Sequence, residues 1–228
     1  MEMSNKTVNW FGPDSLERYN HNRIHNSFVM KNNKWFDAQP FSYSFNNEGF
    51  RCGNFSSNPS VMFLGCSHTF GIGMPLEKSW PQLVANSLEL ENVNLSWPGT
   101  SNDTAFRTAY KYIDRIKPKI VILLSPAVAR CDLVINDTEV ITFHPSDEVQ
   151  ETSSEYKKFY ESWMSSDANI EMNRLKNILA IKQLCELSDI KFISYNFEEV
   201  GFLDLARDLL HFGVNTHLSL SKQILKFV

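Results

Sequence analysis

The sequence predicts an α/β protein built as a three-layer α/β/α sandwich, with a central parallel sheet between two layers of helices. Two observations lead to this prediction. Short apolar runs of the strand type alternate along the chain with longer segments whose apolar residues recur at helical spacing. The runs are apolar throughout, as in strands that a parallel sheet buries on both faces. Such a chain is expected to form right-handed crossovers and to bind ligands at the carboxyl ends of its strands.

The expected elements follow one another from residue 60 to the end. Strands are predicted at residues 60–65, 93–95, 119–124 and 190–195. Helices are predicted around residues 79–90, 101–116, 169–187 and 215–228. Pro118 closes the second helix, and Pro126 stops the third strand because proline removes a backbone donor.

The chain divides into an arm and one domain. Residues 1–58 are rich in Asn, Phe, Trp and Gly without a steady period, and they predict an irregular arm that packs on the domain. Within the arm, residues 42–45 alternate and residues 46–49 offer a turn, which indicates a short hairpin. Residues 59–228 form the predicted α/β/α domain. The polar segment at about 131–168 is expected to be an insertion between a strand and a helix.

Charge and composition exclude several classes of partner. The 228 residues carry a net charge of −4 and form no basic stripe, which argues against nucleic acid and anionic membranes. The four cysteines include no CxxC pair, and the histidines have no metal-ligand spacing. No apolar run has the length of a membrane span, and the first residues lack a secretory pattern. We therefore expect a cytoplasmic or otherwise soluble protein.

A glycine-rich segment begins where the first predicted strand ends. Residues 65–73 read GCSHTFGIG, which places Ser67 on a turn at the ligand edge of the sheet. The glycines let the backbone approach a substrate closely and leave amide N–H groups pointing into the cleft. By itself the segment also suits a loop that cradles phosphate, although it lacks the Gly-Lys-Ser/Thr ending of a nucleotide P-loop.

A second motif lies near the other end of the chain. Asp208 precedes His211 by three residues, which puts the two side chains on one face of a turn. A carboxylate at this place holds the tautomer of the imidazole while the histidine acts as a base. A lone DxxH also arises by chance in surface turns. Asp204 is the alternative orienting residue, at a less direct spacing.

Together, the two motifs resemble the SGNH (GDSL-like) hydrolase family, in the form of a divergent bacterial or phage-type member. Residues 63–73 are similar to its first block, in which Gly-Asp-Ser is followed by Thr and Gly. Residues 94–99 resemble the second block, and Asp208 and His211 match the last one. Upstream, residues 45–51 resemble the Asn-x-x-Gly-Phe-Arg lead-in of some members.

The resemblance implies a flavodoxin-like fold and the activity of a serine esterase. Ser67 would be the nucleophile, His211 the base and Asp208 the residue that orients the base. The amides of Ser67 and Gly99 would form an oxyanion hole, and no cofactor or metal is needed. The expected substrate is a small-molecule or glycan ester, with a carbohydrate O-acetyl ester as the specific expectation.

Two positions depart from the family pattern. Cys66 stands where the first block has Asp, at a mainly structural position. The third block is absent: residues 125–130 read SPAVAR and supply no Asn to donate to an oxyanion. Asn102 is a candidate third donor, although its residue type is equally suited to capping a helix. Arg130 is either a charged donor or a salt-bridge partner.

Two other functions stay open on the sequence. One is an O-acyltransferase, which passes the acyl group to a sugar hydroxyl instead of water. The other is a catalytically weak binding module that kept the fold and lost the third block. Among the remaining candidates, Cys66 is expected to be buried and inert. His68 is expected to point away from Ser67, and His217 to be structural or to form a wall of the cleft.

Overall fold

The computed structural model describes residues 3–136, 139–143 and 154–228. Four parallel strands form the central sheet in the order β4-β3-β5-β8. They are β3 (Ser60–Leu64), β4 (Glu91–Asn94), β5 (Ile120–Ser125) and β8 (Lys191–Asn196). All residues of β3 and β5 are buried, which explains why these strands read as unbroken apolar runs.

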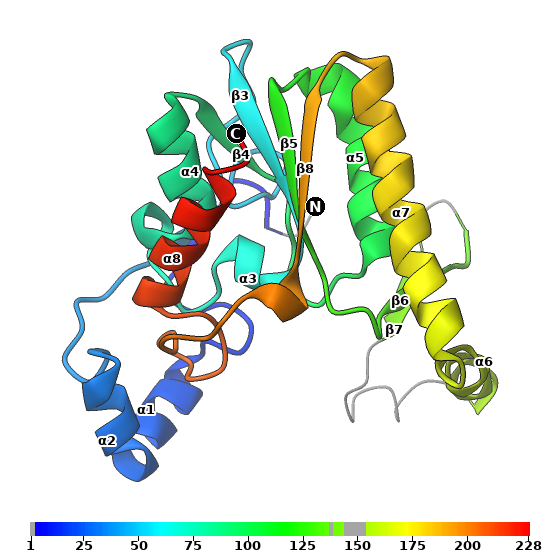
Figure 1. The fold of residues 1–228 in the computed structure, drawn as a ribbon. Helices are drawn as coiled ribbons and strands as arrows, with labels where there is room; N and C mark the ends of the chain where they lie inside the picture. Colours follow the sequence, from blue (N-terminus) through cyan, green and yellow to red (C-terminus); the bar gives the residue numbers. More distant parts are fainter. Residues whose placement is uncertain (1–2, 137–138, 144–153) are drawn as a thin grey trace.

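Helices cover both faces of the sheet, so the predicted α/β/α sandwich is confirmed (Figure 1). One face carries α4 (Trp80–Leu88) and α8 (Val214–Ile224), and the other carries α5 (Asn102–Ile116) and α7 (Asp167–Leu187). Alternate residues of β3 feed the two cores: Val61 and Phe63 pack on the α4/α8 side, and Met62 and Leu64 pack on the α5/α7 side.

Residues 3–58 contain more regular secondary structure than the sequence suggested. Strand β2 (Tyr43–Ser44) pairs antiparallel with β1 (Thr7–Val8). The predicted turn at residues 46–49 is present, but the predicted hairpin is wrong, because the partner of β2 comes from the start of the arm. Two helices, α1 (Leu16–His25) and α2 (Ser27–Asn32), were not predicted.

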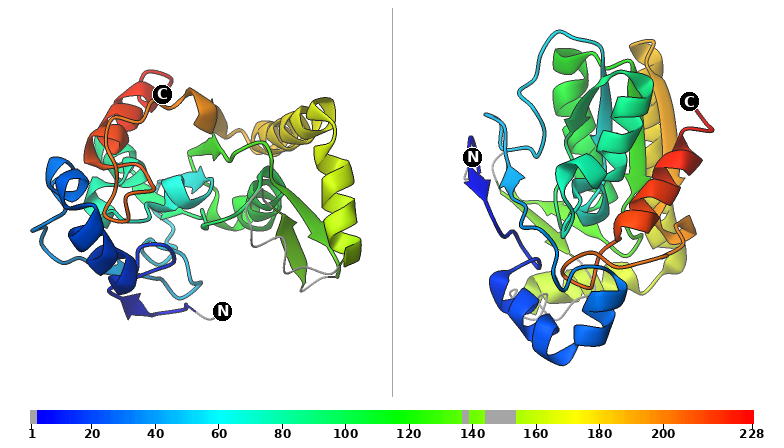
Figure 2. Two further views of the ribbon diagram at one scale, coloured as in Figure 1. Left: turned by 90° about the horizontal axis from the view of Figure 1, so that it is seen from below. Right: turned by 90° about the vertical axis from the view of Figure 1, so that its left-hand side faces the viewer.

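The two views of Figure 2 place α1 and α2 beside the loop that leads into α8. Side-chain hydrogen bonds join the two segments. Asn22 Nδ2 donates to the carbonyl of Asp208 at 3.3 Å, and Trp35 Nε1 donates to the carbonyl of Leu205 at 2.7 Å. Asn33 Oδ1 accepts from the amide of Leu205 at 2.7 Å. The arm is thus attached to the segment that carries the DxxH motif.

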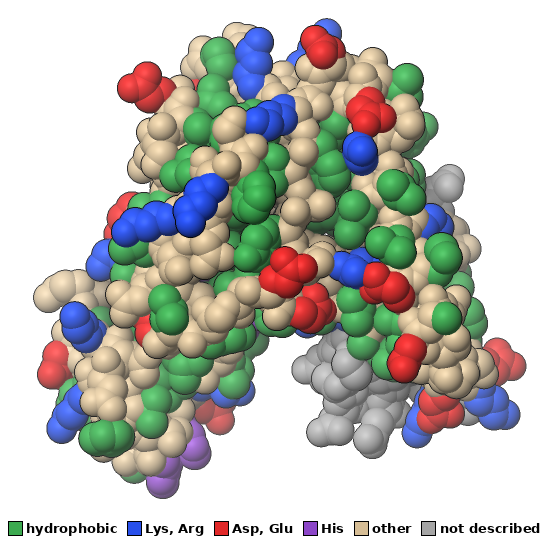
Figure 3. Space-filling model, in the orientation of Figure 1, with side chains coloured by type: hydrophobic (Ala, Val, Ile, Leu, Met, Phe, Trp, Pro, Cys, Tyr) green, Lys and Arg blue, Asp and Glu red, His purple; other side chains and the backbone are tan. Residues whose placement is uncertain are grey.

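The segment predicted as an insertion holds a small hairpin and a helix. Strand β6 (Cys131–Val134) pairs antiparallel with β7 (Val140–Phe143), and α6 (Ser154–Met164) packs on them through an apolar cluster that includes Tyr160. Residues 137–138 and 144–153 of this segment lie outside the described part of the chain. In the space-filling view of Figure 3 the surface is hollowed between α6 and the arm helices.

The described part of the chain also contains two short 3₁₀ helices. One (Leu76–Lys78) precedes α4, and the other (Phe197–Glu199) follows β8. None of the helices in the described ranges is long and apolar enough to cross a membrane.

Candidate active site

Ser67 lies at the carboxyl end of β3, in the loop position that parallel sheets use for ligands. It begins α3 (Ser67–Phe70), directly after the turn formed by Gly65 and Cys66. Gly65 has φ +153°, and a Cβ there would lie 2.2 Å from Thr69 Oγ1. Only glycine fits this tight turn, which brings the chain from the strand into the helix within two residues.

Asp208 and His211 form a hydrogen-bonded pair in the loop before α8. Asp208 Oδ2 lies 2.6 Å from His211 Nδ1, and Asp208 Oδ1 accepts from the amides of Leu210 at 3.0 Å and of His211 at 3.2 Å. An ionised carboxylate only accepts, so Nδ1 carries the proton and the lone pair of Nε2 is left free. This is the tautomer that a general base needs.

The carboxyl of Asp208 stays ionised although it is only 1% exposed. Burial by itself raises its pKa. The hydrogen bond and positive charge of His211, together with the amides of Leu210 and His211, outweigh burial and hold the pKa below its usual value. Asp208 is therefore a fixed negative charge behind the imidazole throughout the neutral pH range.

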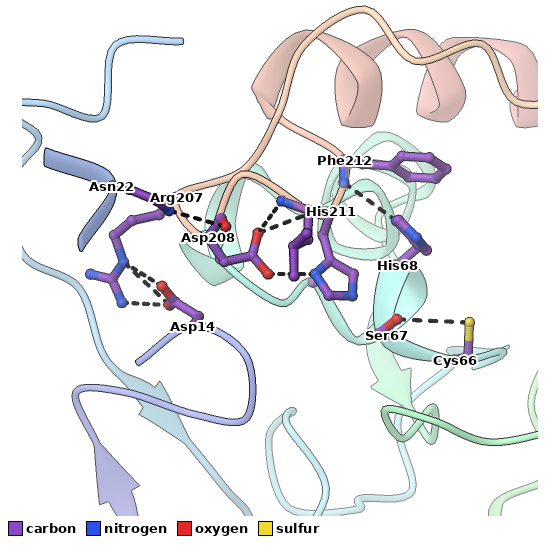
Figure 4. A network of polar contacts seen from close by, with 12 residues as sticks. Asp14, Asn22, Cys66, Ser67, His68, Arg207, Asp208, His211 and Phe212 are labelled. Atoms are coloured by element: carbon purple, nitrogen blue, oxygen red, sulfur yellow. Dashed lines mark hydrogen bonds and ion pairs between the residues drawn. The ribbon is translucent and has the colours of Figure 1, made fainter. Parts of the chain in front are cut away.

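The ring of His211 lies between Asp208 and Ser67 in Figure 4. Within the described residues no hydrogen bond joins Ser67 to His211, and Ser67 Oγ has Cys66 Sγ as its neighbour at 4.0 Å. Such contacts are often long in a protein without substrate and tighten when the complex forms. Ser67 is 7% exposed, so its side chain is largely buried.

Two backbone amides near Ser67 are free to act as donors. Neither the amide of Ser67 nor that of Gly99 donates to another residue in the described part of the chain. Ser67 is the first residue of α3, where helix N–H groups have no intrahelical acceptor. Gly99 has φ +78° in the loop after β4, and nothing lies within 4 Å of where its Cβ would be.

Asn102, the third donor suggested above, is held by two hydrogen bonds at the end of β5. It is 1% exposed, its Nδ2 donates to the carbonyl of Pro126 at 3.2 Å, and its Oδ1 accepts from Ser125 Oγ at 2.9 Å. The side chain therefore ties α5 to the carboxyl end of β5. It does not cap α5 either, because Ser101 is the capping residue and accepts from the amide of Thr104.

Arg130 and Asp204 also have structural partners. Arg130 Nη1 donates to the carbonyl of Thr100 at 3.2 Å, which fixes the loop after Gly99. Asp204 accepts from the amides of Asn215 and Thr216 at the start of α8. Its carboxylate is occupied at the helix N-terminus, so the structure leaves Asp208 as the partner of the imidazole.

His68 lies closer to the site than the sequence suggested. Its ring centroid is 4.8 Å from that of His211 and 3.9 Å from that of Phe212. The expected direction, away from Ser67, assumed the alternation of a strand, but residues 67 and 68 belong to a helix. His217 is completely buried, and its Nδ1 accepts from the amide of Trp80 at 3.0 Å.

The arm supplies residues that hold both loops of the site, and sequence reasoning assigned them no role. Arg51 is 1% exposed and donates to the carbonyls of Phe70 and Met74 in the loop that follows Ser67. Tyr43 Oη accepts from the amide of Gly73 at 2.8 Å and donates to Asp14 at 2.5 Å. The only signal for Arg51 was the Asn-x-x-Gly-Phe-Arg pattern.

An apolar cavity of about 330 Å³ opens beside the turn that precedes Ser67. Residues of β3, the loop after β4, α5 and the arm line it, among them Phe50, Leu64, Gly65, Leu95, Trp97 and Thr100. Thr100 Oγ1 donates to the carbonyl of Gly65 at 3.2 Å, so the wall of the cavity is joined to the nucleophile turn. In the described residues no group of three or more His, Cys, Asp or Glu side chains is arranged to hold a metal ion.

Comparison with known proteins gives matches among solved structures. No family model matches the chain, and no curated protein matches it. The structure of TesA is 12% identical, covers 73% of this chain and 96% of its own, and has a TM-score of 0.41. A lipolytic protein of the G-D-S-L family from Desulfitobacterium hafniense DCB-2 is 16% identical over 75% of this chain and 100% of its own, with a TM-score of 0.40.

Carbohydrate-active proteins occur among the similar structures as well. A carbohydrate esterase described as having "divergent catalytic and non-catalytic binding functions" is 14% identical, with 74% of this chain and 67% of its own covered and a TM-score of 0.39. At these identities the likeness is one of fold, and function has to be argued from the side chains of this chain.

Proposed function

We propose that the protein is a serine esterase that cleaves small or carbohydrate O-acyl esters, with acetyl esters as the first candidates. The observation that carries the proposal is the Asp208–His211 pair, whose buried carboxylate accepts from Nδ1 at 2.6 Å and leaves Nε2 as a base. Ser67 stands at the carboxyl edge of the sheet on the far side of the imidazole (Figure 4). A serine nucleophile, a histidine base and an orienting carboxylate together catalyse acyl transfer to water.

In this mechanism, Ser67 Oγ attacks the ester carbonyl while His211 Nε2 takes the hydroxyl proton. The proton passes from His211 to the leaving alcohol as the acyl–oxygen bond breaks. Water then attacks the acyl-enzyme with His211 as base again, which releases the acid and restores Ser67. The amides of Ser67 and Gly99 would stabilise the negative oxygen of both tetrahedral intermediates.

Asn102, the candidate side-chain donor to the oxyanion, is held inside the protein by Pro126 and Ser125 in the described structure. One oxyanion donor is worth about 10²–10³ in rate. An esterase with only two backbone donors is therefore expected to be slow towards simple substrates. The same observation favours the second candidate, a weak or non-catalytic ester-binding module.

Hydrolysis of p-nitrophenyl acetate and butyrate by the wild type and by Ser67→Ala tests the proposal. Hydrolysis that is lost in Ser67→Ala supports it, and the ratio of the two rates reports whether the apolar cavity beside Gly65 receives the acyl chain. Equal rates in both proteins would contradict it. Addition of a sugar acceptor separates hydrolysis from transfer, since an O-acyltransferase forms an acylated sugar.

An activated phosphonate separates a slow enzyme from a binding module. It labels a serine only when a neighbouring base activates the hydroxyl. Mass spectrometry of the digested protein locates the adduct, so labelling of Ser67 is distinguished from labelling of the adjacent Cys66 thiol. A protein that stays unlabelled at Ser67 favours the binding module.

A further inference from the structure

His68 occupies an unusual place for the residue that follows a nucleophile. Its side chain is buried, with 8% exposure, and it packs in a cluster of aromatic rings. The ring centroids of Phe212, Phe197 and Phe202 lie 3.9, 4.8 and 5.8 Å from that of His68. The fourth neighbour is His211, at 4.8 Å. A bulky apolar residue would fill this space equally well, so the imidazole needs another explanation.

The explanation is a hydrogen bond that links the two catalytic loops. The amide of Phe212 donates to His68 Nδ1 at 3.3 Å (Figure 4). Phe212 directly follows His211, and His68 directly follows Ser67. One imidazole nitrogen therefore connects the residue after the proposed nucleophile with the residue after the proposed base. Because Nδ1 accepts, the neutral ring carries its proton on Nε2.

The surroundings keep this ring neutral, as the hydrogen bond requires. Burial lowers the pKa of His68 well below its usual value, and electrostatic interactions with His211, His217 and Arg130 lower it further. In the described residues, these three are the titratable groups whose electrostatic interactions shift the pKa of His68. A protonated His68 would lose its acceptor for Phe212 and would place a second positive charge beside the imidazolium of His211.

We propose that His68 is a positioning residue: it accepts the amide of Phe212 as a neutral imidazole and so fixes the distance between His211 and Ser67. The proposal rests on the proposed function, because positioning matters only if these two side chains react together. Small errors in this distance are costly, since a displacement of about 1 Å can lower a rate by about 100-fold.

Nitrogen NMR of histidine-labelled wild-type protein tests the state of the ring without any substrate. The signals of His68 are assigned from those that disappear in His68→Asn. We expect a neutral ring with the proton on Nε2 at about pH 6, near the point where an ordinary histidine is half protonated. A ring that carries its proton on Nδ1, or that is protonated at this pH, would overturn the proposal whatever the activity of the protein.

Kinetics of two matched variants test what the hydrogen bond does. Asn places Oδ1 where His68 has Nδ1 and preserves the acceptor, whereas Leu fills the space without one. We expect kcat of His68→Leu to fall by about 100-fold with KM little changed. We expect His68→Asn to retain most of the activity. Equal losses in both variants, in step with their thermal stability, would show that His68 only fills space.

The outcomes separate this proposal from the proposed function. Activity that depends on Ser67 but not on the acceptor at position 68 overturns the positioning role alone. Activity that is the same in Ser67→Ala and the wild type overturns the proposed function, and the positioning role with it. If His68→Leu does not fold, the NMR tautomer in the wild type and kcat of His68→Asn still decide.

Discussion

Asp14 and Arg207 lie 193 positions apart in the sequence and form a buried, bidentate ion pair. Arg207 Nε donates to Asp14 Oδ1 at 2.9 Å, and Nη2 donates to Oδ2 at 2.6 Å. The side chain of Arg207 is 5% exposed and that of Asp14 is 1% exposed. Arg207 immediately precedes Asp208, so the pair fixes the start of the loop that holds His211 (Figure 4). The arm thus helps to position the carboxylate behind the proposed base.

Asp14→Ala is predicted to destabilise the protein strongly. The variant leaves the guanidinium of Arg207 buried without its charged partner, and breaking a buried pair in this way costs about 3–5 kcal/mol. Urea denaturation followed by circular dichroism measures the loss. Glu186→Ala is the matched control, because it removes an exposed ion pair with Lys182, and such pairs contribute about 1 kcal/mol or less. Similar losses in the two variants would show that the arm does not depend on this pair.

Asp208→Asn is predicted to lower kcat by about 10³–10⁴-fold, with a much smaller effect on KM. An amide in place of the carboxylate can donate to Nδ1, which moves the imidazole proton to Nε2 and removes the base. The rates with p-nitrophenyl acetate, measured at neutral pH, check this outcome.

Asp204→Asn is the control for that experiment, since Asp204 was the alternative orienting residue. Its carboxylate accepts from Thr216 and Asn215 at the start of α8, so the variant should weaken folding and leave kcat near the wild-type value. A larger loss of kcat in Asp204→Asn than in Asp208→Asn would reverse the assignment.

The sequence is informative about the site where local patterns decide the structure. Strand β3 and the turn at Gly65 follow from an unbroken apolar run that ends in glycine. Asp208 and His211 were found because three-residue spacing in a tight turn brings them together. The roles of Asp14 and Arg207 left no such signal, because their pairing depends on how the arm folds back across the domain.

Two side chains have surroundings that the sequence reasoning did not anticipate. His68 was assigned the alternation of a strand, but α3 begins at Ser67, and successive residues of a helix are not on opposite faces. Asn102 was expected at the cleft because it starts a helix near Gly99. Its side chain instead satisfies Ser125 and Pro126 at the end of β5, a need that is visible only in three dimensions.

His217 is predicted to make the folded protein less stable as the pH falls. Complete burial, with the positive charges of Arg51 and His211, lowers its pKa to about 3. Between an ordinary histidine pKa of about 6.5 and that value, the unfolded chain binds a proton at this site and the folded chain does not. Unfolding then takes up a proton, so the free energy of unfolding decreases with falling pH by up to about 1.4 kcal/mol per pH unit.

Urea denaturation of the wild type and of His217→Asn between neutral and mildly acidic pH measures this contribution. Asn keeps an acceptor near the amide of Trp80 and removes the titrating group. The variant should lose stability less steeply as the pH falls. The control is His25→Asn on the exposed face of α1, which should leave the slope unchanged. Identical slopes in wild type and His217→Asn would mean that other groups cause the acid sensitivity.

Gly73→Ala, a substitution in the loop that follows Ser67, is predicted to displace Asp208 and with it the proposed base, His211. Gly73 has φ +71°, and a Cβ there would lie 2.8 Å from Ala206 Cβ and 3.2 Å from Asp208 Oδ1. Neither neighbour can move without shifting the DxxH loop, because Gly73 O also accepts from the amide of Arg207 at 3.1 Å. We therefore expect kcat to fall by about tenfold or more, in addition to a loss of stability.

Gly12→Ala is the matched control for Gly73→Ala. Gly12 also has a left-handed conformation, with φ +57°, but a Cβ there would meet only Ile72 Cδ1 at 3.8 Å, an ordinary contact. Its substitution should cost only the backbone strain of about 1–2 kcal/mol and leave kcat near the wild-type value. Melting temperatures separate strain from steric conflict. If the two variants lose stability equally and both keep full kcat, the close contact between Gly73 and Asp208 has no part in holding the base.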